Sequence, residues 1–451
     1  MTASRVLARP VARLLAPSGE RRQLHQPDLW LLTTLLVLAM FGTIMVFSAS
    51  FALGVRQPGS DGYAYLVRHL LWLAIGLAGM TVAALIDYRV WRKVAFIGMV
   101  LALGLLALVL VPGIGVEVWG AQRWMTLGPV SLQPAELAKL ALVVYLAHWL
   151  AQKGARVRQL SYGVVPFTLL IGLLIGLVML QPDLGSSVVL ALIGASMLFV
   201  AGVPLWQFAL LLVSGSAAFL ALALSAPYRR ERLLLFLSPD RELLDPAGKL
   251  LGLGWQMAQA RLAFGSGGLF GVGLGASRQK FLWLFAAHSD AIFAVIGEEL
   301  GLVGCLCVIG LYLVLGWRGY RIARRAPDTF GALLAVGITT WILAQAAINI
   351  GGITSTTPFT GIPLPFVSYG GTSLVVTLTA MGIVLSVSRA TVRSTGARPV
   401  QMSLPGEGRG PEAREVDVTL TSDPAPGEAG VGHDSRRRRP GPRRWMRRAR
   451  Q

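Results

Sequence analysis

One aspartate lies at the start of a long apolar run. Asp290 follows His288 and Ser289 and precedes mainly apolar residues up to Gly297. Partial burial disfavours the charged form of a carboxylate, and the raised pKa that results would suit Asp290 to the role of general base. The alternative is that Asp290 caps the N-terminus of a helix, and for this residue taken alone the alternative is narrowly favoured.

A second polar group opens another apolar run. Pro134 suits the first turn of a helix, which places Glu136 and Lys139 on one helix face at i and i+3. As an isolated motif this is best interpreted as an ion pair that satisfies itself. Three residues just upstream could instead complete a pocket for an anionic headgroup such as pyrophosphate: Arg123, Trp124 and Gln133.

Three further carboxylates have different interpretations. Asp183, in a tight turn between two apolar runs, is sufficiently explained as the N-cap of the next helix. Glu298 and Glu299 lie two turns or more deeper than Asp290, where a carboxylate requires a cationic partner or a water-filled cavity. Lys139 is the candidate partner, and the two glutamates are assigned a structural or gating role.

Two uncharged segments complete the candidate site. In residues 358–373, hydroxyl groups and free backbone N–H groups follow a proline-rich stretch, and such groups can bind an anion or a sugar. The candidate substrate-binding residues are Arg123, Trp124, Gln133, Asp183, His288, Ser368, Tyr369, Thr372 and Ser373. The glycine-rich run 265–275 lacks the ending of a phosphate loop and is interpreted as a flexible or closely packed loop. Gln345 and Asn349, at i and i+4, are interpreted as hydrogen-bonding contacts between helices.

The composition indicates that membrane helices position these residues. The 451 residues are 54% hydrophobic and only 14% charged, with a mean hydropathy of +0.62. These values exclude a cytosolic enzyme and a collagen-like, disulfide-rich or mainly disordered protein. Cys305 and Cys307 point about 200° apart on a helix and therefore predict neither a disulfide nor a metal site.

The apolar runs predict an all-α, polytopic membrane protein with ten transmembrane helices. Each run is near the length that crosses ~30 Å of hydrocarbon. The predicted spans are 29–50, 66–86, 93–111, 134–151, 162–180, 185–200, 205–225, 288–316, 331–353 and 367–389.

Charge in the short loops predicts the orientation. The loops 87–93, 153–158 and 318–325 are basic, and simple alternation places them on the same side as both Arg-bearing tails. By the positive-inside rule this side is the cytoplasm, so the basic charge does not indicate a nucleic-acid partner. The segments predicted to face outward are 51–65, 112–133, 181–184, 226–287 and 354–366, and the large loop 226–287 is long enough to carry helices of its own.

Three regions follow along the chain. Residues 1–28 form a basic cytoplasmic tail without a cleavable signal peptide, residues 29–390 form the membrane domain, and residues 391–451 form an Arg-rich cytoplasmic tail. The last region lacks apolar periodicity and is predicted to be disordered.

Four strings give the membrane domain a resemblance to a known family. QPAELAK (133–139), QPDLGSS (181–187), HSDAIFAVIGEELG (288–301) and GIPLPFVSYGGTSL (361–374) resemble hallmarks of the SEDS family (FtsW, RodA, SpoVE), in the family's order. Members of that family are integral-membrane peptidoglycan glycosyltransferases with ten spans, cytoplasmic termini and a large outer loop between spans seven and eight. The last string and the long tail look more like the FtsW branch. The departures are mild: Ala135 stands where Ser is common and Ser289 where Thr is common.

The resemblance implies polymerisation of lipid II at the outer face of the cytoplasmic membrane, for septal wall synthesis in cell division. It assigns three catalytic residues: Asp290 as the essential aspartate, and Glu136 and Lys139 as the family's acidic and basic pair. Arg123 and Lys139 would stabilise the leaving diphosphate, with Mg²⁺ or Mn²⁺ as an optional cofactor and no dedicated metal ligands. The implied partners are lipid II, the growing glycan strand, a class B penicillin-binding protein, other division proteins and membrane lipid.

Three rival functions remain open at the level of sequence. A transporter that flips lipid II would also use ten spans and membrane-embedded charges such as Lys139. An elongation polymerase of the RodA type and a non-catalytic scaffold are the other two. The inward short loops carry no polar constellation comparable to the outward one, which disfavours the transporter.

Overall fold

The computed structural model describes residues 26–55, 62–118, 121–128, 130–225, 227–237, 252–281 and 283–390. The structural statements below refer to these residues. The helices are α2 Leu29–Val55, α3 Ala64–Leu85, α4 Val90–Leu108, α5 Pro134–Lys153, α6 Val165–Leu180, α7 Leu184–Val200, α8 Leu205–Ser225, α9 Pro227–Leu237, α10 Gly252–Gly267, α11 Ile292–Arg324, α12 Thr329–Ile353 and α13 Gly371–Arg389. Apart from residues 26–28, the two predicted tails lie outside this described part.

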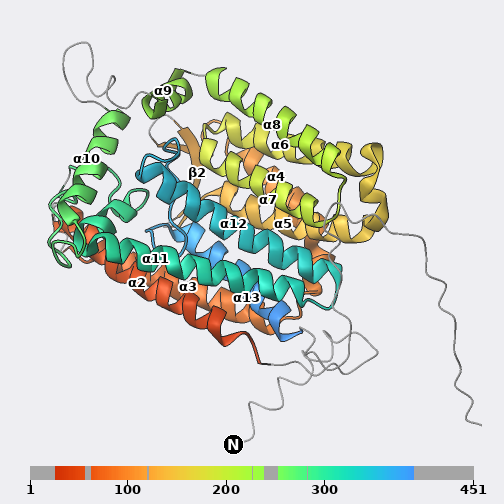
Figure 1. The fold of residues 1–451 in the computed structure, drawn as a ribbon, viewed down its shortest axis with the longest axis horizontal. Helices are drawn as coiled ribbons and strands as arrows, with labels where there is room; N and C mark the ends of the chain where they lie inside the picture. Colours follow the sequence, from red (N-terminus) through yellow and green to blue (C-terminus); the bar gives the residue numbers. More distant parts are fainter. Residues whose placement is uncertain are drawn as a thin grey trace, which may run out of the picture. The chain divides into compact units, whose positions relative to one another are not determined.

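The predicted spans correspond one by one to ten of these helices, which form a helical bundle (Figure 1). Within the described part of the chain, nine helices are long and apolar enough to cross a membrane, and α7 is a shorter apolar helix of 17 residues. The all-α polytopic class is therefore confirmed. Several boundaries differ from prediction by a few residues. α11 begins at Ile292 and ends at Arg324, and α13 begins at Gly371; turns precede the starts of both helices.

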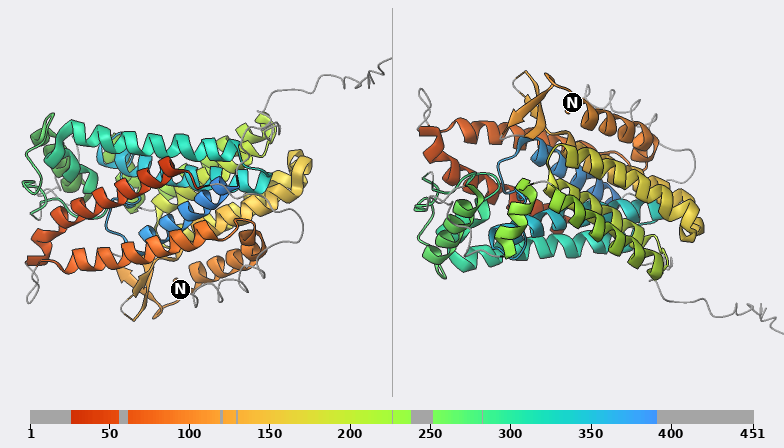
Figure 2. Two further views of the ribbon diagram at one scale, coloured as in Figure 1. Left: turned by 90° about the horizontal axis from the view of Figure 1, so that it is seen from below. Right: turned by 90° about the horizontal axis from the view of Figure 1, so that it is seen from above.

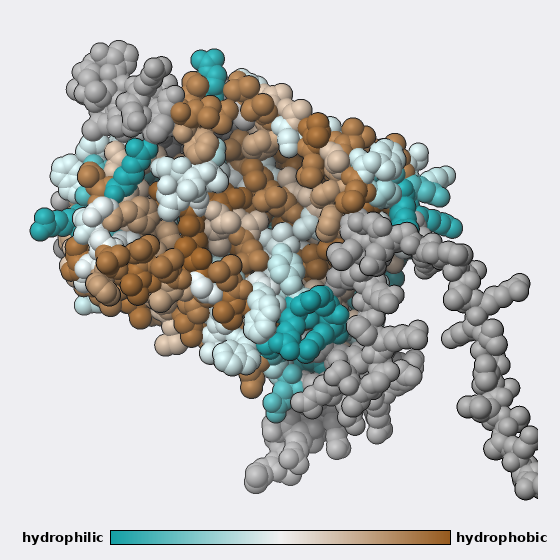
Figure 3. Space-filling view, viewed as in Figure 1, coloured by the Kyte–Doolittle hydropathy of each residue, from teal (hydrophilic) through white to brown (hydrophobic). Residues whose placement is uncertain are grey.

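The core of the bundle is formed by α5, α12 and α13, which are largely buried. Close approach of backbones makes this possible, as between α13 and α3: a side chain at Gly382 would meet the carbonyl oxygen of Met80 at 2.3 Å. In lipid, the hydrophobic effect does not drive helices together, so van der Waals packing has to. Small residues promote this packing because they let backbones approach closely. The outer surface, by contrast, exposes large apolar side chains over the helices (Figure 3).

The basic loops meet at one end of the bundle, here called the basic end. Arg318 pairs with Asp28, and Arg89 pairs with Asp328 at 3.0 Å. Arg389 donates to the carbonyl oxygen of Ala84 at 2.8 Å. These contacts join the start of α2, the turn between α3 and α4, and the ends of α11 and α13, so the predicted common side of the basic loops agrees with the packing.

The described parts of the segments predicted to face outward lie at the opposite end, here called the loop end (Figure 2). Residues 112–133 form an antiparallel sheet of β1 Gly115–Val118, β2 Ala121–Leu127 and β3 Val130–Leu132, in that order. The predicted helices of the large loop are confirmed as α9 and α10. The small sheet was not predicted, because its strands are short and carry little alternation.

Candidate functional site

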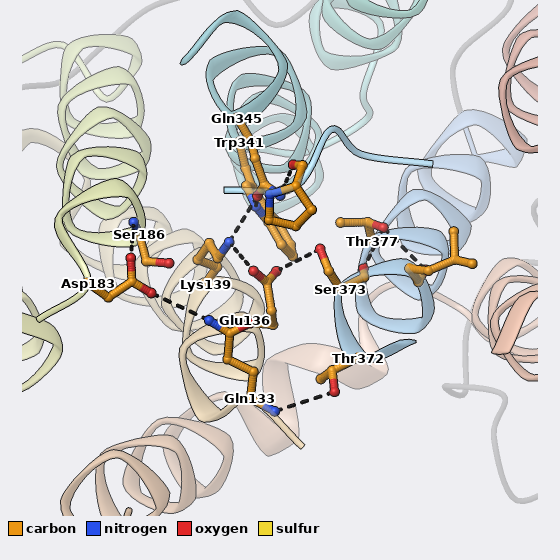
Figure 4. Close-up of polar contacts among 12 residues, drawn as sticks. Gln133, Glu136, Lys139, Asp183, Ser186, Trp341, Gln345, Thr372, Ser373 and Thr377 are labelled. Carbon is orange, nitrogen blue, oxygen red and sulfur yellow. Dashed lines mark hydrogen bonds and ion pairs between the residues drawn. The ribbon is translucent and has the colours of Figure 1, made fainter. Parts of the chain in front are cut away.

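The ion pair of α5 is buried in the centre of the site (Figure 4). Lys139 Nζ lies 2.7 Å from Glu136 Oε1, and the two side chains are 0% and 1% exposed. Lys139 also donates to Gln345 Oε1 at 2.9 Å, and Ser373 Oγ donates to Glu136 at 3.3 Å. The ion pair expected from the isolated motif is therefore present, and Gln345 and Ser373 complete its hydrogen bonds. The catalytic role predicted for Glu136 and Lys139 stays a prediction.

Two amides of α12 connect this pair to Asp290. Gln345 accepts from Lys139 and donates to the carbonyl oxygen of Pro363 at 3.0 Å. One turn further, Asn349 donates to the carbonyl oxygens of Asp290 at 2.8 Å and Ile362 at 2.7 Å. Gln345 and Asn349 thus hold the site together, which is more specific than the general interhelical contact predicted for them.

Asp290 lies in a turn before α11 and does not cap that helix. The residue at the N-cap position is Ala291, and no side chain bonds there to the first turn. The carboxylate instead points to the loop after α12, where a side chain at Gly361 would meet Asp290 Oδ2 at 3.4 Å. Capping was the narrowly favoured interpretation of the isolated residue, and it is wrong because the chain turns once more before the helix begins.

The surroundings of Asp290 raise its pKa to about 7. Loss of hydration on burial is the largest cause, and the nearby carboxylate of Asp183 acts in the same direction. Arg123, Arg232 and a hydrogen bond from Ser289 lower the pKa and only partly offset the burial. A carboxyl group with this pKa can exchange a proton near neutral pH.

The sheet places Arg123 beside Asp290. Arg123, on β2, donates to the carbonyl oxygens of Gln181, at 2.9 Å, and Pro182. This contact ties the sheet to the turn before α7. Trp124 follows on the same strand, and successive strand residues point to opposite faces of a sheet. Its role in the predicted pocket stays a prediction.

Asp183 has the capping role that was predicted. Its carboxylate accepts from the backbone N–H of Ser186 at 3.0 Å, at the start of α7. The other carboxylate oxygen accepts from the Gln133 side chain at 3.4 Å (Figure 4). Asp183 is 3% exposed and acts on Asp290 by charge, so it belongs to the site although its cap alone would explain it.

One arginine of the site was missed in the sequence. Arg232 lies on α9 of the large loop and donates to the carbonyl oxygens of Phe359 at 3.4 Å and Thr360 at 3.2 Å. These carbonyls precede Gly361, which borders Asp290. Arg232 is one of several basic residues in a surface-like segment, so only the fold distinguishes it.

The hydroxyl groups of the last predicted segment bond mainly within the protein. Ser368 donates to the carbonyl oxygen of Ser289 at 2.6 Å, and Thr372 donates to that of Ser131 at 2.9 Å. Ser373 is bonded to Glu136 as described above. These three side chains therefore contact backbone and the ion pair, and the direct substrate contact predicted for them stays a prediction.

His288 and Tyr369 belong to an aromatic cluster. The Tyr369 backbone N–H donates to the His288 carbonyl oxygen at 2.9 Å, and their rings lie 5.5 Å apart. Tyr65, at the start of α3, lies 5.2 Å from His288 and 5.5 Å from Tyr369 between ring centroids. Burial lowers the pKa of His288 to about 4, so its imidazole stays neutral near neutral pH.

Glu298 and Glu299 have a partner other than the one predicted. Lys139 is engaged in α5, and the cation beside Glu299 is Lys280 of the large loop, at 2.8 Å. Glu298 accepts from the Ser277 hydroxyl at 2.5 Å and from the Arg278 backbone N–H at 2.9 Å. Lys280 could not be identified from the sequence because its position in a long loop gave no indication of burial.

The described residues contain no group of three or more His, Cys, Asp or Glu side chains arranged to hold a metal ion. Two carboxylates, Asp290 and Asp183, lie close enough to influence each other. Mg²⁺ is commonly held by one or two carboxylates together with substrate phosphates, so this pair fits a substrate-borne ion and does not fit a dedicated all-protein site.

Comparisons with known proteins agree with this architecture. The family model for FtsW, RodA and SpoVE, described as "Cell cycle protein", matches residues 29–393. A probable peptidoglycan glycosyltransferase FtsW of Trichlorobacter lovleyi is 42% identical over 81% of this chain and 94% of its own length. The stage V sporulation protein E of Bacillus subtilis is 42% identical over 80% of this chain and 97% of its own length.

Solved structures extend the similarity to the fold. One, described as "Structural coordination of polymerization and crosslinking by a peptidoglycan synthase complex", matches with a TM-score of 0.65 and 31% identity over 80% of this chain and 98% of the other. The rod shape determining protein RodA of Thermus thermophilus matches with a TM-score of 0.59 and 29% identity over 81% and 98%. The chain is therefore a multi-pass membrane protein that belongs to the FtsW, RodA and SpoVE family.

Proposed function

We propose that this protein is a peptidoglycan glycosyltransferase that polymerises lipid II at the outer face of the cytoplasmic membrane. One observation carries the proposal: Asp290, with a pKa near 7, lies at the loop end of the bundle within the influence of the charges of Arg123 and Arg232. The names of the FtsW relatives and of the solved peptidoglycan synthase complex support the same activity.

The chemistry assigns a role to each of these groups. Asp290 accepts the proton of an acceptor sugar hydroxyl while the hydroxyl oxygen attacks the anomeric carbon of the donor. The bond from that carbon to the diphosphate breaks, and the polyprenyl diphosphate leaves with the bonding electrons. Arg123 and Arg232 stabilise the charge that develops on it. Attack opposite the leaving group inverts the anomeric centre.

Lys139 takes a different role from the one that the resemblance implied. Because Lys139 is buried and bonded to Glu136 and Gln345, we assign it to holding the loop after α12 in place. A divalent cation, Mg²⁺ or Mn²⁺, would add Lewis-acid stabilisation of the diphosphate if it entered with the substrate, with Asp183 and Asp290 nearest to it.

The cellular role of the proposal is septal wall synthesis with a class B penicillin-binding protein as partner. The description of the solved synthase complex, which joins polymerisation to crosslinking, supports such a partner. Other division proteins would direct the complex to the septum. Elongation is the alternative role, since RodA shares the fold.

The test is a purified polymerisation assay on lipid II with the wild type and Asp290→Asn. We expect glycan strands from the wild type and none from the variant, while the variant folds normally by circular dichroism. Polymer made by Asp290→Asn would remove Asp290 from the mechanism. A transporter would instead move lipid II between leaflets of vesicles in both proteins and form no polymer.

A further inference from the structure

The long helix α11 is broken at Gly301 on its way into the bundle. Gly301 has φ 67° and ψ −164°, and these angles separate a short outer segment, 292–300, from the rest of α11. A helix broken in this way leaves backbone groups without their usual partners, and within a membrane such groups require protein partners. Asp290 lies immediately before the outer segment, so the position of this segment decides the position of Asp290.

The glycine-rich loop is inserted into this break. Glu298 and Glu299 would normally accept from residues four positions on, but their carbonyl oxygens accept from the N–H groups of Val272 at 2.9 Å and Gly273 at 3.0 Å. On the other side of the break, two more N–H groups lack their helical partners. That of Leu302 donates to the carbonyl oxygen of residue 268 at 3.0 Å, and that of Val303 to the carbonyl oxygen of residue 269 at 3.1 Å. Loop and broken helix therefore complete each other's hydrogen bonds.

Side chains fasten the same loop to the outer segment and to α2. Lys280 Nζ lies 2.8 Å from Glu299 Oε1 and donates to Ser48 Oγ of α2 at 2.9 Å and to the Gly275 carbonyl oxygen at 2.8 Å. Ser48 in turn donates to Glu299 at 2.7 Å. Lys280 and Glu299 are 4% and 0% exposed.

We propose that Lys280 and Glu299 are positioning residues, whose buried ion pair fixes the outer segment of α11 against α2 and thereby holds Asp290 in its place at the loop end. Neither residue touches the reacting atoms. The pair is a costly way to stabilise a fold, because removal of two charges from water offsets most of their attraction. What an ion pair adds over an apolar contact is a fixed geometry.

Three variants separate positioning from stability. Lys280→Met and Glu299→Met each leave one charge buried without its partner, and we expect each to lower the unfolding temperature by more than about 5 °C. The double variant Lys280→Met with Glu299→Met contains no such charge, and we expect it to unfold within about 3 °C of the wild type. Arg318→Met, which removes the ion pair to Asp28 at the basic end, is the control.

The first readout is independent of catalysis. In a background of Cys305→Ala and Cys307→Ala, an Asp290→Cys substitution is labelled with a membrane-impermeant maleimide. We expect the double variant to raise the labelling rate at least about threefold, because the outer segment moves more freely, and Arg318→Met to leave it unchanged. An unchanged rate in the stable double variant overturns the positioning role, whatever the protein's activity.

The second readout rests on the proposed function. With Asp290 present, we expect the double variant to lose about 100-fold in kcat on lipid II with little change in KM, since small displacements of a catalytic group have effects of this size. The acid limb of its pH profile should move to lower pH, because Asp290 becomes more hydrated among Arg123, Arg232 and Asp183. Wild-type kcat and an unmoved limb in the double variant would show that the pair serves stability alone.

Discussion

At the scale of single residues, the site depends on one carboxyl group, Asp290, whose surroundings shift its pKa in opposite directions. Burial and Asp183 favour the protonated form of Asp290, and two arginines favour the ionised form. The balance leaves a pKa of about 7, which suits a group that must lose and gain a proton in each cycle. A fully exposed aspartate would be ionised but a weaker base.

The pH dependence of the reaction follows from this pKa. A general base acts only when ionised, and Asp290 is ionised above its pKa of about 7. We therefore expect kcat/KM for polymerisation to fall about tenfold for each pH unit below 7 and to level off above it. The profile is measured with purified protein and lipid II between pH 5.5 and 8.5, a range set around the pKa. A flat profile down to its acid end would contradict the assignment.

Two lysines of α5 provide a matched comparison. Lys139 is fully buried against Glu136, whereas Lys153 lies at the basic end of the helix with its Nζ 5.6 Å from the Trp149 ring. We expect Lys139→Met to destabilise the fold by roughly 3–5 kcal/mol, because Glu136 is left buried without a cation, and to abolish polymerisation. Lys153→Met should change neither the free energy of unfolding nor polymerisation. Thermal unfolding in detergent and the polymerisation assay report both effects, and equal losses in the two variants would argue against the buried pair.

At the scale of elements, the site depends on short segments that interrupt the spans. The sheet carries Arg123, α9 carries Arg232, the turn before α11 carries Asp290, and the turn before α7 carries Asp183. None of these lies within a membrane helix. The helices fix where the segments meet, and the segments present the charged groups there.

The break in α11 gives a prediction at this scale. Gly271 has φ 80°, and a side chain there would meet the Glu299 carbonyl oxygen at 2.1 Å. We expect Gly271→Ala to cost roughly 2 kcal/mol or more of unfolding free energy, from backbone strain and from the clash. Gly98→Ala is the control, since nothing lies within 4 Å of a side chain at that position of α4. Thermal unfolding of both variants measures the difference, and similar melting temperatures would contradict the tight insertion.

At the scale of the whole molecule, the two ends of the bundle differ in what their charged groups form. The basic loops, with the Arg318–Asp28 and Arg89–Asp328 ion pairs, lie at the basic end, and the candidate site with Arg123 lies at the loop end. The positive-inside rule assigns the basic end to the cytoplasm. The candidate site then opens to the outer face, where an enzyme that builds the cell wall must act.

Cysteine labelling in intact cells tests this orientation. Leu274, at the loop end, and Tyr162, at the basic end, are 60% and 62% exposed, so the two positions are matched. In the background of Cys305→Ala and Cys307→Ala, we expect a membrane-impermeant maleimide to label Leu274→Cys in intact cells, and Tyr162→Cys only after permeabilisation. The reverse pattern would place Asp290 inside the cell and would refute the proposed function.

Sequence alone determined the class of the protein, the positions of ten helices and the residues of the ion pair in α5, because apolar runs and residues at i and i+3 are local properties. It also identified Asp290, Asp183 and Arg123 as candidates. The sequence could not decide which charges meet, since partners such as Lys280 and Glu299 or Arg232 and Asp290 come from different segments.

Tertiary structure decided those pairings, reversed the interpretation of Asp290 as a helix cap, and decided between the two alternatives for the glycine-rich run in favour of close packing. Asp290 is a buried acid and not a helix cap, because the chain turns once more before α11. The glycine-rich run is the segment that completes a broken helix, because its backbone replaces the hydrogen bonds lost at Gly301. In both cases the deciding contacts join residues that are distant in the chain or lie in irregular backbone, where local propensity carries little information.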